Sequence, residues 1–481
     1  MELKRLIKNL DVLEIDGNTD IDIKEIKVDS NQVTKGCMFI CLCGKDFDGH
    51  DFIKQVEQYG ASVIITEKRI QTSLTQILVK DTRVAMCAIA SEFYESVDKK
   101  MKIIAVLGTN GKTTVSQLIK KSMDKLGIEC GVIGTTGCFY RDKYIEPTLT
   151  TPDPLDLFRI LFDMYKSGVN TVVMEVSAHA VFWDKIKFIK FYAAVFTNFS
   201  QDHLDFFLNM ENYKQAKLKF FKENECEYVI TNSDDILGRE INLLVPKAIS
   251  YGIKNPADIF AIDVEEKITG SKFVINLFDY VCNMKLNLLG EFNVYNVLAA
   301  ACTLVIAGIK PESAVEVLES IEGVDGRLER VYDGNFKIYI DYAHTPDGLK
   351  KVLFTLKHVK EGKLINVFGC GGNRDEKKRK LMGEVSASFA DFTVITSDNP
   401  RFEEPMYIIN EIEKGVLQSS KNYVAIEDRI DAIKYAINMA RDGDVILIAG
   451  KGCEMYQEIL GIKKPYNDKD IVTEYLRSKT L

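Results

Sequence analysis

Histidine and tryptophan are scarce in this chain, which has 5 histidines and 1 tryptophan among 481 residues. Long apolar runs are missing as well. The longest, at residues 297–309 (VLAAACTLVIAGI), is too short to cross a bilayer and contains a threonine. The first residues, MELKRLIKNLDVLEID, become acidic where a secretory signal needs an apolar centre. We therefore expect a cytoplasmic protein that does not insert into membranes.

The chain also lacks an excess of basic residues, because 62 lysines and arginines face 70 acidic residues, giving a net charge of -8. This balance argues against a nucleic-acid surface, but it allows local pockets for small anions. The 11 cysteines are scattered and form no Cys-x-x-Cys pair of the zinc-ribbon kind. We expect reduced, mostly buried thiols.

What the chain does contain is a repeated alternation of short apolar runs and helical patterns. From Ile103 on, the runs IIAVLG, CGVIGT, TVVMEVS and AAVFTNF predict a parallel sheet covered on both faces. A second set (KIYIDY, LINVFG, FTVIT, VILIAG) follows the polar residues 325–335, which we interpret as a hinge. The predicted fold class is α/β with three domains: a small N-terminal α/β domain (1–98), a central domain with a mostly parallel sheet (99–327) and a C-terminal Rossmann-like α/β domain (328–481).

A glycine turn in the central domain, GTNGKTT at residues 108–114, joins a predicted strand to a predicted helix. Gly108 and Gly111 let backbone amides turn towards phosphate oxygens, and the helix N-terminus adds its positive dipole end. Lys112 supplies a point charge, and Thr113 can bind magnesium. This GxxGK[ST] variant predicts a P-loop-type ATPase domain. It does not name the reaction, because ATPases, kinases, GTPases and ligases all use such loops.

Two further predicted strands end in polar residues: TVVM leads into Glu175, and AAVFTNF leads into Asp202 and His203. The ends of neighbouring parallel strands would lie near the phosphate loop, as a second magnesium site requires. Each carboxylate could instead be an ordinary loop residue or a helix cap. In the next helical pattern, MENYKQAKLKFF, Lys217 lies beside the apolar stripe. It either snorkels to solvent or is a desolvated amine that is modified or catalytic.

A rigid turn, SDNPRFEEP at residues 397–405, ends a predicted strand of the C-terminal domain. It displays Arg401 among three acidic residues. Either Arg401 pairs with Glu403 or Glu404 on the surface, or the turn presents both signs of charge to a ligand.

Several stretches, in this order, resemble the Mur ligases of bacterial cell-wall synthesis, which share ATP-dependent amide formation with folylpolyglutamate synthetase. The stretches are DSNQVTKGCMFICLCGKDFDGHDFI, GTNGKTT, TTPDPLDLF, MEVSAHA, NFSQDHLDFF, YKQAK, GEFNVYNVLAA, GRLERV, DYAHTPDGL, GCGGNRDEKKRKLMG, DNPR and GKGCE. The first stretch and DNPR are similar to the MurE-type branch, whose members add the third residue of the peptidoglycan stem. The resemblance implies an ATP-dependent acid–amino-acid ligase that works through an acyl phosphate.

The resemblance also implies a role for individual residues. The implied ATP contacts are Gly108, Thr109, Asn110, Gly111, Lys112, Thr113, Thr114, Asn293, Asn296, Arg327 and Asp341. Two Mg²⁺ ions would be served by Thr113, Glu175, His203 and a carbamate on Lys217, and Lys112 and His344 complete the implied catalytic set. The implied contacts of UDP-N-acetylmuramoyl-L-alanyl-D-glutamate are Ser30, Gly44, Lys45, Asp46, Phe47, Thr150, Thr151, Ser177 and Lys185. Those of meso-2,6-diaminopimelate are Arg374, Asp398, Asn399, Pro400, Arg401, Gly450 and Glu454.

The charges of the turn suggest how the amino acid would be selected. Asp398 and Asn399 are expected to take the distal ammonium, while Arg401 clamps the distal carboxylate. L-Lysine has no distal carboxylate and would leave Arg401 unpaired, whereas meso-lanthionine would fit equally well. The alternative is a protein of a different class, a P-loop ATPase switch without ligase activity. Such a protein would hydrolyse ATP without needing both a carboxylate substrate and an amine substrate. Small molecules are the only partners that we expect, and we expect a monomer.

Four positions depart from the family pattern. Lys185 stands where an arginine is common, and Phe207 where a histidine is usual. Asn373 replaces an aspartate, and Cys453 replaces a histidine. None of them removes a proposed phosphate or magnesium ligand, so we expect these four residues to change the contacts with the substrates instead.

Overall fold

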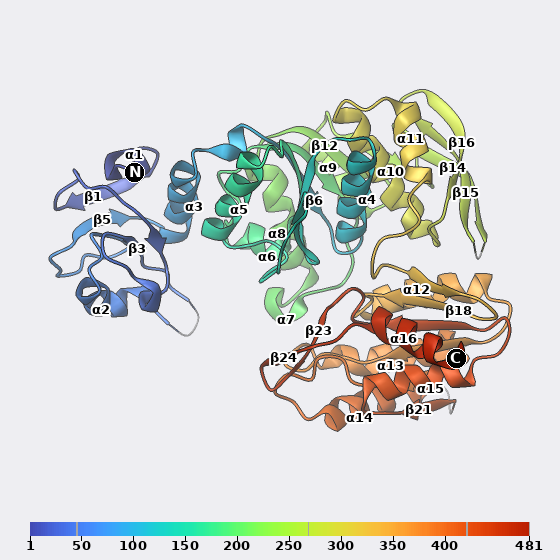
Figure 1. Ribbon diagram of the computed structural model, residues 1–481. Coiled ribbons are helices and arrows are strands. Elements are labelled where there is room, and N and C mark those ends of the chain that lie inside the picture. The colour runs from blue at the N-terminus through green and yellow to red at the C-terminus, as the bar shows by residue number, and fades with distance from the viewer. Residues whose placement is uncertain (45–46, 268, 420–421, 481) are drawn as a thin grey trace.

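The computed structural model describes residues 1–44, 47–267, 269–419 and 422–480. Its strands form three main sheets and one hairpin. Figure 1 shows the N-terminal sheet in blue at one end, the middle sheet in green and yellow beside it, and the orange and red C-terminal sheet below. The main sheets use strands within residues 12–79, 102–286 and 329–449. The predicted α/β fold class is confirmed.

The N-terminal part is a small sheet with helices packed on it. Its elements are α1 (Leu3–Leu6), β1 (Val12–Asp16), β2 (Ile26–Lys27), η1 (Ser30–Gln32), β3 (Met38–Ile40), η2 (Gly49–Phe52), α2 (Ile53–Gln58), β4 (Val63–Thr66), β5 (Thr75–Val79), α3 (Thr82–Phe93) and η3 (Val97–Lys99). The strand order is β1-β5-β4-β3-β2, with β1 antiparallel to β5 and the other neighbours parallel. Asp81 caps α3 by accepting hydrogen bonds from Arg83 N (2.8 Å) and Val84 N (3.0 Å).

The middle part is built on an 11-stranded sheet in the order β16-β15-β14-β13-β12-β11-β6-β10-β7-β8-β9. Its strands are β6 (Lys102–Leu107), β7 (Cys130–Gly134), β8 (Gly137–Tyr140), β9 (Lys143–Ile145), β10 (Thr171–Glu175), β11 (Phe191–Phe196), β12 (Cys226–Asn232), β13 (Ile249–Gly252), β14 (Ile259–Lys267), β15 (Gly270–Leu277) and β16 (Tyr280–Leu286). Its helices are α4 (Lys112–Lys125), α5 (Pro154–Lys166), α6 (Ala178–Phe182), α7 (Leu204–Phe207), α8 (Met210–Glu223), α9 (Ile236–Leu244), α10 (Glu291–Ile306) and α11 (Pro311–Glu319).

The parallel core of this sheet follows the apolar runs of the sequence. Strand β6 lies between β11 and β10, and all three run in the same direction. Buried apolar clusters line both faces, as continuous apolar strands require. The antiparallel edges, β14 to β16 and β7 to β9, are additions that the sequence analysis does not predict, because hydrophobic periodicity carries no information on strand direction.

The C-terminal part has a six-stranded sheet in the order β17-β18-β22-β19-β20-β21. Its elements, with the hairpin β23-β24, are β17 (Glu329–Asp333), β18 (Lys337–Asp341), α12 (Pro346–Val359), β19 (Leu364–Phe368), α13 (Lys377–Phe389), β20 (Phe392–Ile395), α14 (Pro405–Val416), β21 (Tyr423–Ala425), α15 (Arg429–Met439), β22 (Val445–Ala449), β23 (Tyr456–Ile459), β24 (Ile462–Pro465) and α16 (Asp468–Thr480). The hinge predicted at residues 325–335 is wrong in extent, because residues 329–333 pair antiparallel with β18 as an edge strand. A polar edge strand resembles a loop in the sequence, because the edge of the strand that has no partner strand lies in solvent and tolerates polar residues.

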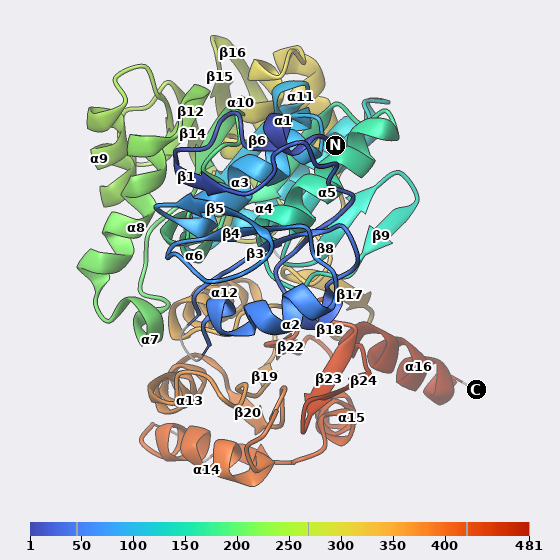
Figure 2. The same ribbon diagram turned by 90° about the vertical axis from the view of Figure 1, so that its left-hand side faces the viewer.

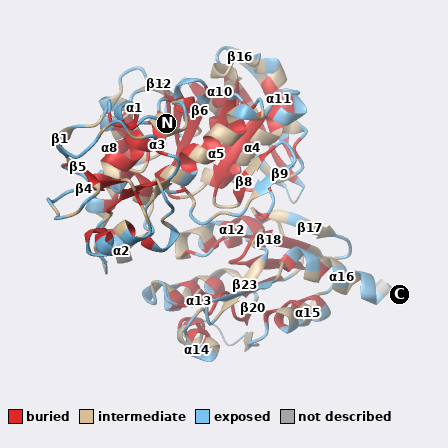
Figure 3. Cartoon of the chain, turned by 60° about the vertical axis from the view of Figure 1, so that its left-hand side comes forward, coloured by how far each residue is buried: buried red, intermediate tan, exposed pale blue. Residues whose placement is uncertain are grey.

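Burial is concentrated in the strands and on the inward faces of the helices, whereas the connecting loops and α16 are more exposed (Figure 3). The apolar run at residues 297–309 falls largely within α10, which packs in the core of the middle part. Among the described residues, no helix combines the length and the apolar character needed to cross a membrane.

Candidate active site

The phosphate loop leaves β6 and enters α4, as the sequence predicts. Gly111 has φ +85°, and a Cβ at this position would lie 2.5 Å from Asn296 Oδ1, so a side chain there would be both strained and in collision. Lys112 Nζ donates hydrogen bonds to the backbone oxygens of Gly108 (3.0 Å) and Thr109 (2.8 Å). The lysine thus folds over its own loop. Burial lowers the pKa of Lys112, while Glu175 and Asp202 oppose this effect.

Two of the implied ATP contacts, Asn293 and Asn296, lie on α10. Asn296 Nδ2 donates to Asn293 Oδ1 at 3.0 Å, and Asn293 Nδ2 donates to the backbone oxygen of Leu289 at 2.8 Å. Both side chains are buried. Because α10 packs against α4, this pair is held beside the phosphate loop.

Glu175 ends β10 and forms a cluster of oxygen atoms with the buried Thr113 and the half-buried Thr135. Its Oε2 accepts hydrogen bonds from Thr113 Oγ1 (3.1 Å) and Thr135 Oγ1 (2.9 Å), and its Oε1 accepts one from Thr135 N (3.0 Å). Carboxylate and hydroxyl oxygens at the end of a phosphate loop are the donor set that Mg²⁺ prefers. The sequence analysis missed Thr135, although it directly follows β7 and the strand-end rule would have found it.

The residues predicted to contact the peptide arm of the nucleotide lie next to this cluster. Thr150 Oγ1 is 3.1 Å from Thr135 Oγ1, and Thr151 Oγ1 donates to the backbone oxygen of Glu175 at 2.9 Å. Ser177 N donates to Thr151 Oγ1 at 3.0 Å. Lys185 Nζ pairs with Asp153 Oδ1 at 2.7 Å, so this lysine already has a carboxylate partner from the same chain.

Asp202 and His203 follow β11 on the other side of the loop. His203 has φ +55° and places Nε2 3.5 Å from Asp202 Oδ2, and its ring lies 4.8 Å from that of His179. Burial raises the pKa of the Asp202 carboxyl, but His203, His344 and Lys112 outweigh it, so the net shift is downwards. Strands β10 and β11 both neighbour β6, which explains why their ends meet the loop.

Lys217 on α8 is only 2% exposed, so it does not snorkel to solvent. Its Nζ lies 4.7 Å from the centre of the Tyr213 ring, and within the described part of the chain it forms no ion pair. Burial, with a further contribution from Lys112, places the pKa of Lys217 well below its usual range. Tyr213 OH lies 3.3 Å from Thr109 Oγ1, which ties this helix to the phosphate loop. Burial therefore favours the neutral amine, which is the form that can add CO₂.

Phe207, one of the departures from the family pattern, completes the packing around this helix. Its ring lies 5.2 Å from Tyr213 and 5.3 Å from His179. It is 4% exposed. Phe207 therefore supports the residues around Lys217.

The C-terminal part contacts the loop through residues at its entry. Arg327 Nη2 donates to Thr113 Oγ1 at 2.8 Å, and its guanidinium lies 4.4 Å from the Tyr342 ring. Asp341 holds the chain on either side, since its oxygens accept from Leu328 N (2.6 Å) and Ala343 N (2.7 Å). Burial raises the pKa of the Asp341 carboxyl.

Two more contacts complete this boundary. Asn110 Nδ2 donates to Asp347 Oδ2 at 3.3 Å, and the exposed His344 places Nδ1 3.0 Å from the backbone oxygen of Tyr342. Asp347 is a further residue that the sequence analysis missed, because no strand end or motif position marks it.

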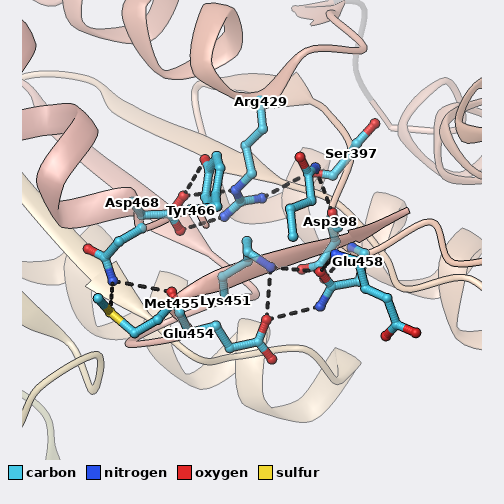
Figure 4. Close-up of polar contacts among 12 residues, drawn as sticks. Ser397, Asp398, Arg429, Lys451, Glu454, Met455, Glu458, Tyr466 and Asp468 are labelled. Carbon is cyan, nitrogen blue, oxygen red and sulfur yellow. Dashed lines mark hydrogen bonds and ion pairs between the residues drawn. The ribbon is translucent and has the colours of Figure 1, made fainter. Parts of the chain in front are cut away.

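The turn at residues 397–400 belongs to a network of charged residues in the C-terminal part (Figure 4). Asn399 Oδ1 accepts hydrogen bonds from Lys451 Nζ and Glu458 N, both at 2.9 Å, and its Nδ2 donates to Glu454 Oε2 at 3.0 Å. Lys451 Nζ also donates to Glu454 Oε2 at 2.8 Å. The amide of Asn399 is therefore hydrogen-bonded within the protein, and a ligand ammonium at its oxygen would compete with Lys451 Nζ and Glu458 N.

Asp398 keeps one oxygen available in this network. Its Oδ1 accepts from Asn399 N at 2.7 Å. Its Oδ2 faces Gly450, where φ is +113° and a Cβ would lie 2.6 Å away. Only glycine allows this approach. Pro400 is buried, and the Arg374 side chain is exposed and forms no ion pair among the residues that the structure describes.

Arg401 lies in the same turn with φ +52°. Its Nε donates to Glu458 Oε2 at 3.1 Å and its Nη1 to the backbone oxygen of Gly372 at 2.8 Å. The alternative pairing with Glu403 or Glu404 is wrong, because Glu403 accepts from Arg379 Nη2 at 2.9 Å and Arg401 pairs with Glu458. L-Lysine would not leave Arg401 unpaired, as Glu458 is already there. The sequence could not show this partner, which comes from another strand.

Asn373, a second departure, supports the turn from the loop after β19. Its Oδ1 accepts from Phe402 N at 3.0 Å, and its own backbone N–H donates to Glu403 Oε1. A third departure, Cys453, has its backbone N 2.2 Å from where a Cβ of Gly326 would stand, close to the entry of the C-terminal part.

The N-terminal residues predicted to hold the uridine end lie on and beside the small sheet, which faces the viewer in Figure 2. Ser30 is buried in η1, Gly44 N donates to Phe47 O at 2.8 Å, and Phe47 is 56% exposed. Lys45 and Asp46 lie outside the described residues. Arg83 connects this region to the middle part, because its Nη2 donates to Cys43 O at 2.6 Å and its guanidinium lies 4.7 Å from the Trp183 ring.

Cys43, Asp48 and His50 bring three possible metal ligands together beside this loop. Glu67 N donates to His50 Nε2 at 3.0 Å, so a neutral His50 carries its proton on Nδ1, which lies 2.5 Å from Asp48 Oδ1. A metal at Nδ1 would have to displace that proton while Nε2 is still an acceptor. The cluster is therefore a hydrogen-bonded support of the loop.

Comparison with known proteins places these observations in one family. The Mur ligase family catalytic domain matches residues 22–120, the Mur ligase middle domain residues 106–304, and the Mur ligase glutamate ligase domain residues 326–452. A UDP-N-acetylmuramoyl-L-alanyl-D-glutamate--2,6-diaminopimelate ligase from Syntrophomonas wolfei is 40% identical, with 100% of each chain covered.

Two solved structures extend the comparison. A structure of a UDP-N-acetylmuramoyl-L-alanyl-D-glutamate--2,6-diaminopimelate ligase is 31% identical, with TM-score 0.73 and coverage of 100% of this chain and 99% of that one. A MurF ligase from Thermotoga maritima in complex with ADP shares the fold at 20% identity and TM-score 0.63, covering 95% of this chain and 97% of that one. The chain belongs to the Mur ligase family.

Proposed function

We propose that this chain is an ATP-dependent ligase that joins meso-2,6-diaminopimelate to the γ-carboxylate of the D-glutamate in UDP-N-acetylmuramoyl-L-alanyl-D-glutamate. The observation that carries the reaction class is that three features meet: the phosphate loop with Lys112, the carboxylate of Glu175 at the end of the neighbouring strand β10, and helix α8, which carries the buried Lys217. The relative with 40% identity over its whole length bears the name of this activity. The product would serve the synthesis of peptidoglycan precursors.

The residues support a two-step reaction. The γ-carboxylate of the nucleotide substrate attacks the γ-phosphate of ATP, which gives an acyl phosphate and ADP; the amine of the amino acid then displaces phosphate. Lys112, released from its loop oxygens by the bound nucleotide, would stabilise the charge that develops on the transferred phosphate. Arg327 and Asp347 bring the C-terminal part onto the loop, which would exclude water from the acyl phosphate.

Two magnesium ions fit the donors that the structure offers. Thr113 Oγ1 and Glu175 Oε2 lie 3.1 Å apart in a buried cluster of oxygen atoms, which suits a first ion. His203 and a carbamate on Lys217 would hold a second, and the burial of Lys217, which lowers its pKa and favours the neutral amine, supports that modification. When bound, the ions would neutralise charge on the phosphates.

The two substrates would occupy different parts of the chain. We assign residues 1–98 to the UDP end of the nucleotide, residues 99–327 to ATP and the reacting carboxylate, and residues 328–481 to the amino acid. Thr150, Thr151, Ser177 and Lys185 would line the path of the dipeptide arm. We expect the chain to act as a monomer in the cytoplasm.

The amino acid would be recognised by its zwitterionic far end. Asp398 and Glu454 offer carboxylates to the ammonium, while Arg401 and Arg374 offer guanidinium groups to the carboxylate. meso-Lanthionine carries the same end groups and is the second candidate.

Phosphate release with ATP and the nucleotide dipeptide tests this proposal. We expect release to depend on the amino acid, and to be fastest with meso-diaminopimelate among that compound, meso-lanthionine, L-lysine and L-ornithine. Hydrolysis that proceeds equally without the nucleotide dipeptide and the amino acid would instead identify a P-loop switch.

A further inference from the structure

Glu458 on β23 lies against Arg401 and has no role in the assignments above. Its Oε2 accepts from Arg401 Nε at 3.1 Å, and its backbone oxygen accepts from Arg401 N at 3.1 Å. Its own backbone N–H donates to Asn399 Oδ1 at 2.9 Å. Glu458 is thus fixed by the residues on both sides of Pro400. The Glu458 carboxylate thus contacts the Arg401 guanidinium, which would bind the distal carboxylate of the substrate.

The other two nitrogen atoms of the Arg401 guanidinium are only partly engaged in hydrogen bonds. Arg401 Nη1 donates to Gly372 O at 2.8 Å, and Nη2 makes no hydrogen bond within the part of the chain that the structure describes. The side chains of Arg401 and Glu458 are 20% and 21% exposed, so a ligand can reach the pair. A ligand carboxylate at Nη2 would share one positive charge with Glu458 and would be repelled by it.

We propose that Glu458 is a specificity-determining residue for the amino-acid substrate. It satisfies Arg401 when the far end of the substrate carries no carboxylate, and it competes with that carboxylate when one is present. This inference rests on the proposed function, since it concerns the same amino-acid site. Removing the charge of Glu458 leaves the whole charge of Arg401 to the ligand, and therefore sharpens the preference for meso-diaminopimelate over L-lysine.

Glu458→Gln tests this directly, because glutamine keeps a hydrogen-bond acceptor for Arg401 Nε and removes only the charge. We expect the KM for meso-diaminopimelate to fall about fivefold, the size of a partly shielded ion pair. We expect kcat to change little. The ratio of kcat/KM for meso-diaminopimelate to that for L-lysine should rise by about the same factor. Glu458→Ala should shift the ratio in the same direction.

Glu404→Gln is the matched control, because Glu404 is an exposed acid of the same turn that forms no ion pair among the described residues. We expect the control to leave the ratio unchanged. A rise in the KM for meso-diaminopimelate in both Glu458 variants would mean that Glu458 only holds Arg401 in place, and would overturn the proposal. An equal shift in Glu404→Gln would show that any acidic residue of the turn has this effect, and would also overturn the proposal.

The wild-type chain separates this inference from the proposed function. If wild-type phosphate release does not depend on meso-diaminopimelate, the proposed function itself fails. If the wild-type chain is an active ligase and Glu458→Gln has the same substrate ratio, only the role of Glu458 is refuted.

Discussion

Replacement of Arg401 by alanine is the sharpest test of the amino-acid site, because the structure isolates what the substitution removes. Residue 401 has φ +52°, but both arginine and alanine carry a Cβ, so the backbone strain stays the same. The turn stays tied to β23 by hydrogen bonds from position 401 N to Glu458 O (3.1 Å) and from Leu460 N to position 401 O (2.7 Å). We therefore expect a folded variant, destabilised by only about 1 kcal/mol.

The effect on the substrate should be much larger than the effect on the fold. A carboxylate held by the guanidinium gains two charge-assisted hydrogen bonds of about 1.5–3 kcal/mol each. Glu458 competes with the ligand carboxylate for Arg401 and so lowers this gain in binding free energy. A net loss of about 3 kcal/mol corresponds to a rise of roughly a hundredfold in the KM for meso-diaminopimelate. In the variant, Glu458 would also face the ligand carboxylate without a positive charge between them, which adds to the loss.

Initial rates of phosphate release at varied concentrations of meso-diaminopimelate and of ATP measure this effect. We expect the KM for ATP to stay unchanged, because none of the proposed ATP contacts belongs to this turn. Arg401→Lys should recover only part of the affinity, since lysine keeps the charge but loses the planar fork. An unchanged KM for meso-diaminopimelate in Arg401→Ala would remove Arg401 from the site.

Three further substitutions test other parts of the molecule. Lys217→Ala should abolish ligation and be partly rescued by a short carboxylic acid that replaces the carbamate; full activity without the acid would rule out carbamoylation. Arg327→Ala removes the 2.8 Å hydrogen bond to Thr113 Oγ1. It should raise the KM for ATP about tenfold, the value of one charge-assisted hydrogen bond, and an unchanged KM would contradict its role in closure. The hydrogen bond from Lys68 lowers the pKa of the Asp48 carboxyl and outweighs the opposing effect of burial. The ionised carboxylate therefore stabilises the fold at a pH above its pKa in the unfolded chain, which is about 4. This stabilisation is lost as the pH falls towards the pKa of Asp48 in the folded protein. Asp48→Asn should therefore lower the melting temperature at pH 7 by more than at pH 3, and an equal loss at both would refute the linkage.

The departures from the family pattern acquire physical roles in the structure. Asn373 accepts from Phe402 N and so fixes the turn that carries Arg401. Lys185 pairs with Asp153, so a ligand carboxylate would have to compete for it or share it. Phe207 packs on Tyr213, whose ring also contacts Lys217 Nζ. None of these three contacts involves a proposed phosphate or magnesium ligand.

Structure is predicted from sequence most reliably where a single local pattern specifies it. GTNGKTT encodes its own glycine turn and helix start, and TVVME encodes a buried strand that ends in a carboxylate. Prediction works less well for polar edge strands. Residues 329–333 look like a hinge because their apolar pattern is weak, yet they pair with β18. The antiparallel edges of the middle sheet escaped prediction for a related reason, since strand direction depends on the partner and not on the strand.

The amino-acid sequence by itself determined the α/β class and the glycine turn between a strand and a helix, because both follow from short-range periodicity or from residue types at fixed spacing. For the carboxylates and for Lys217 it left alternatives open. Tertiary structure alone decided which charges meet. Glu458 reaches Arg401 across 57 positions, and Arg327 reaches Thr113 across 214. Burial of Lys217 is likewise a property of everything packed around it. Electrostatic partners and desolvation depend on distances in space, and a linear pattern does not contain them.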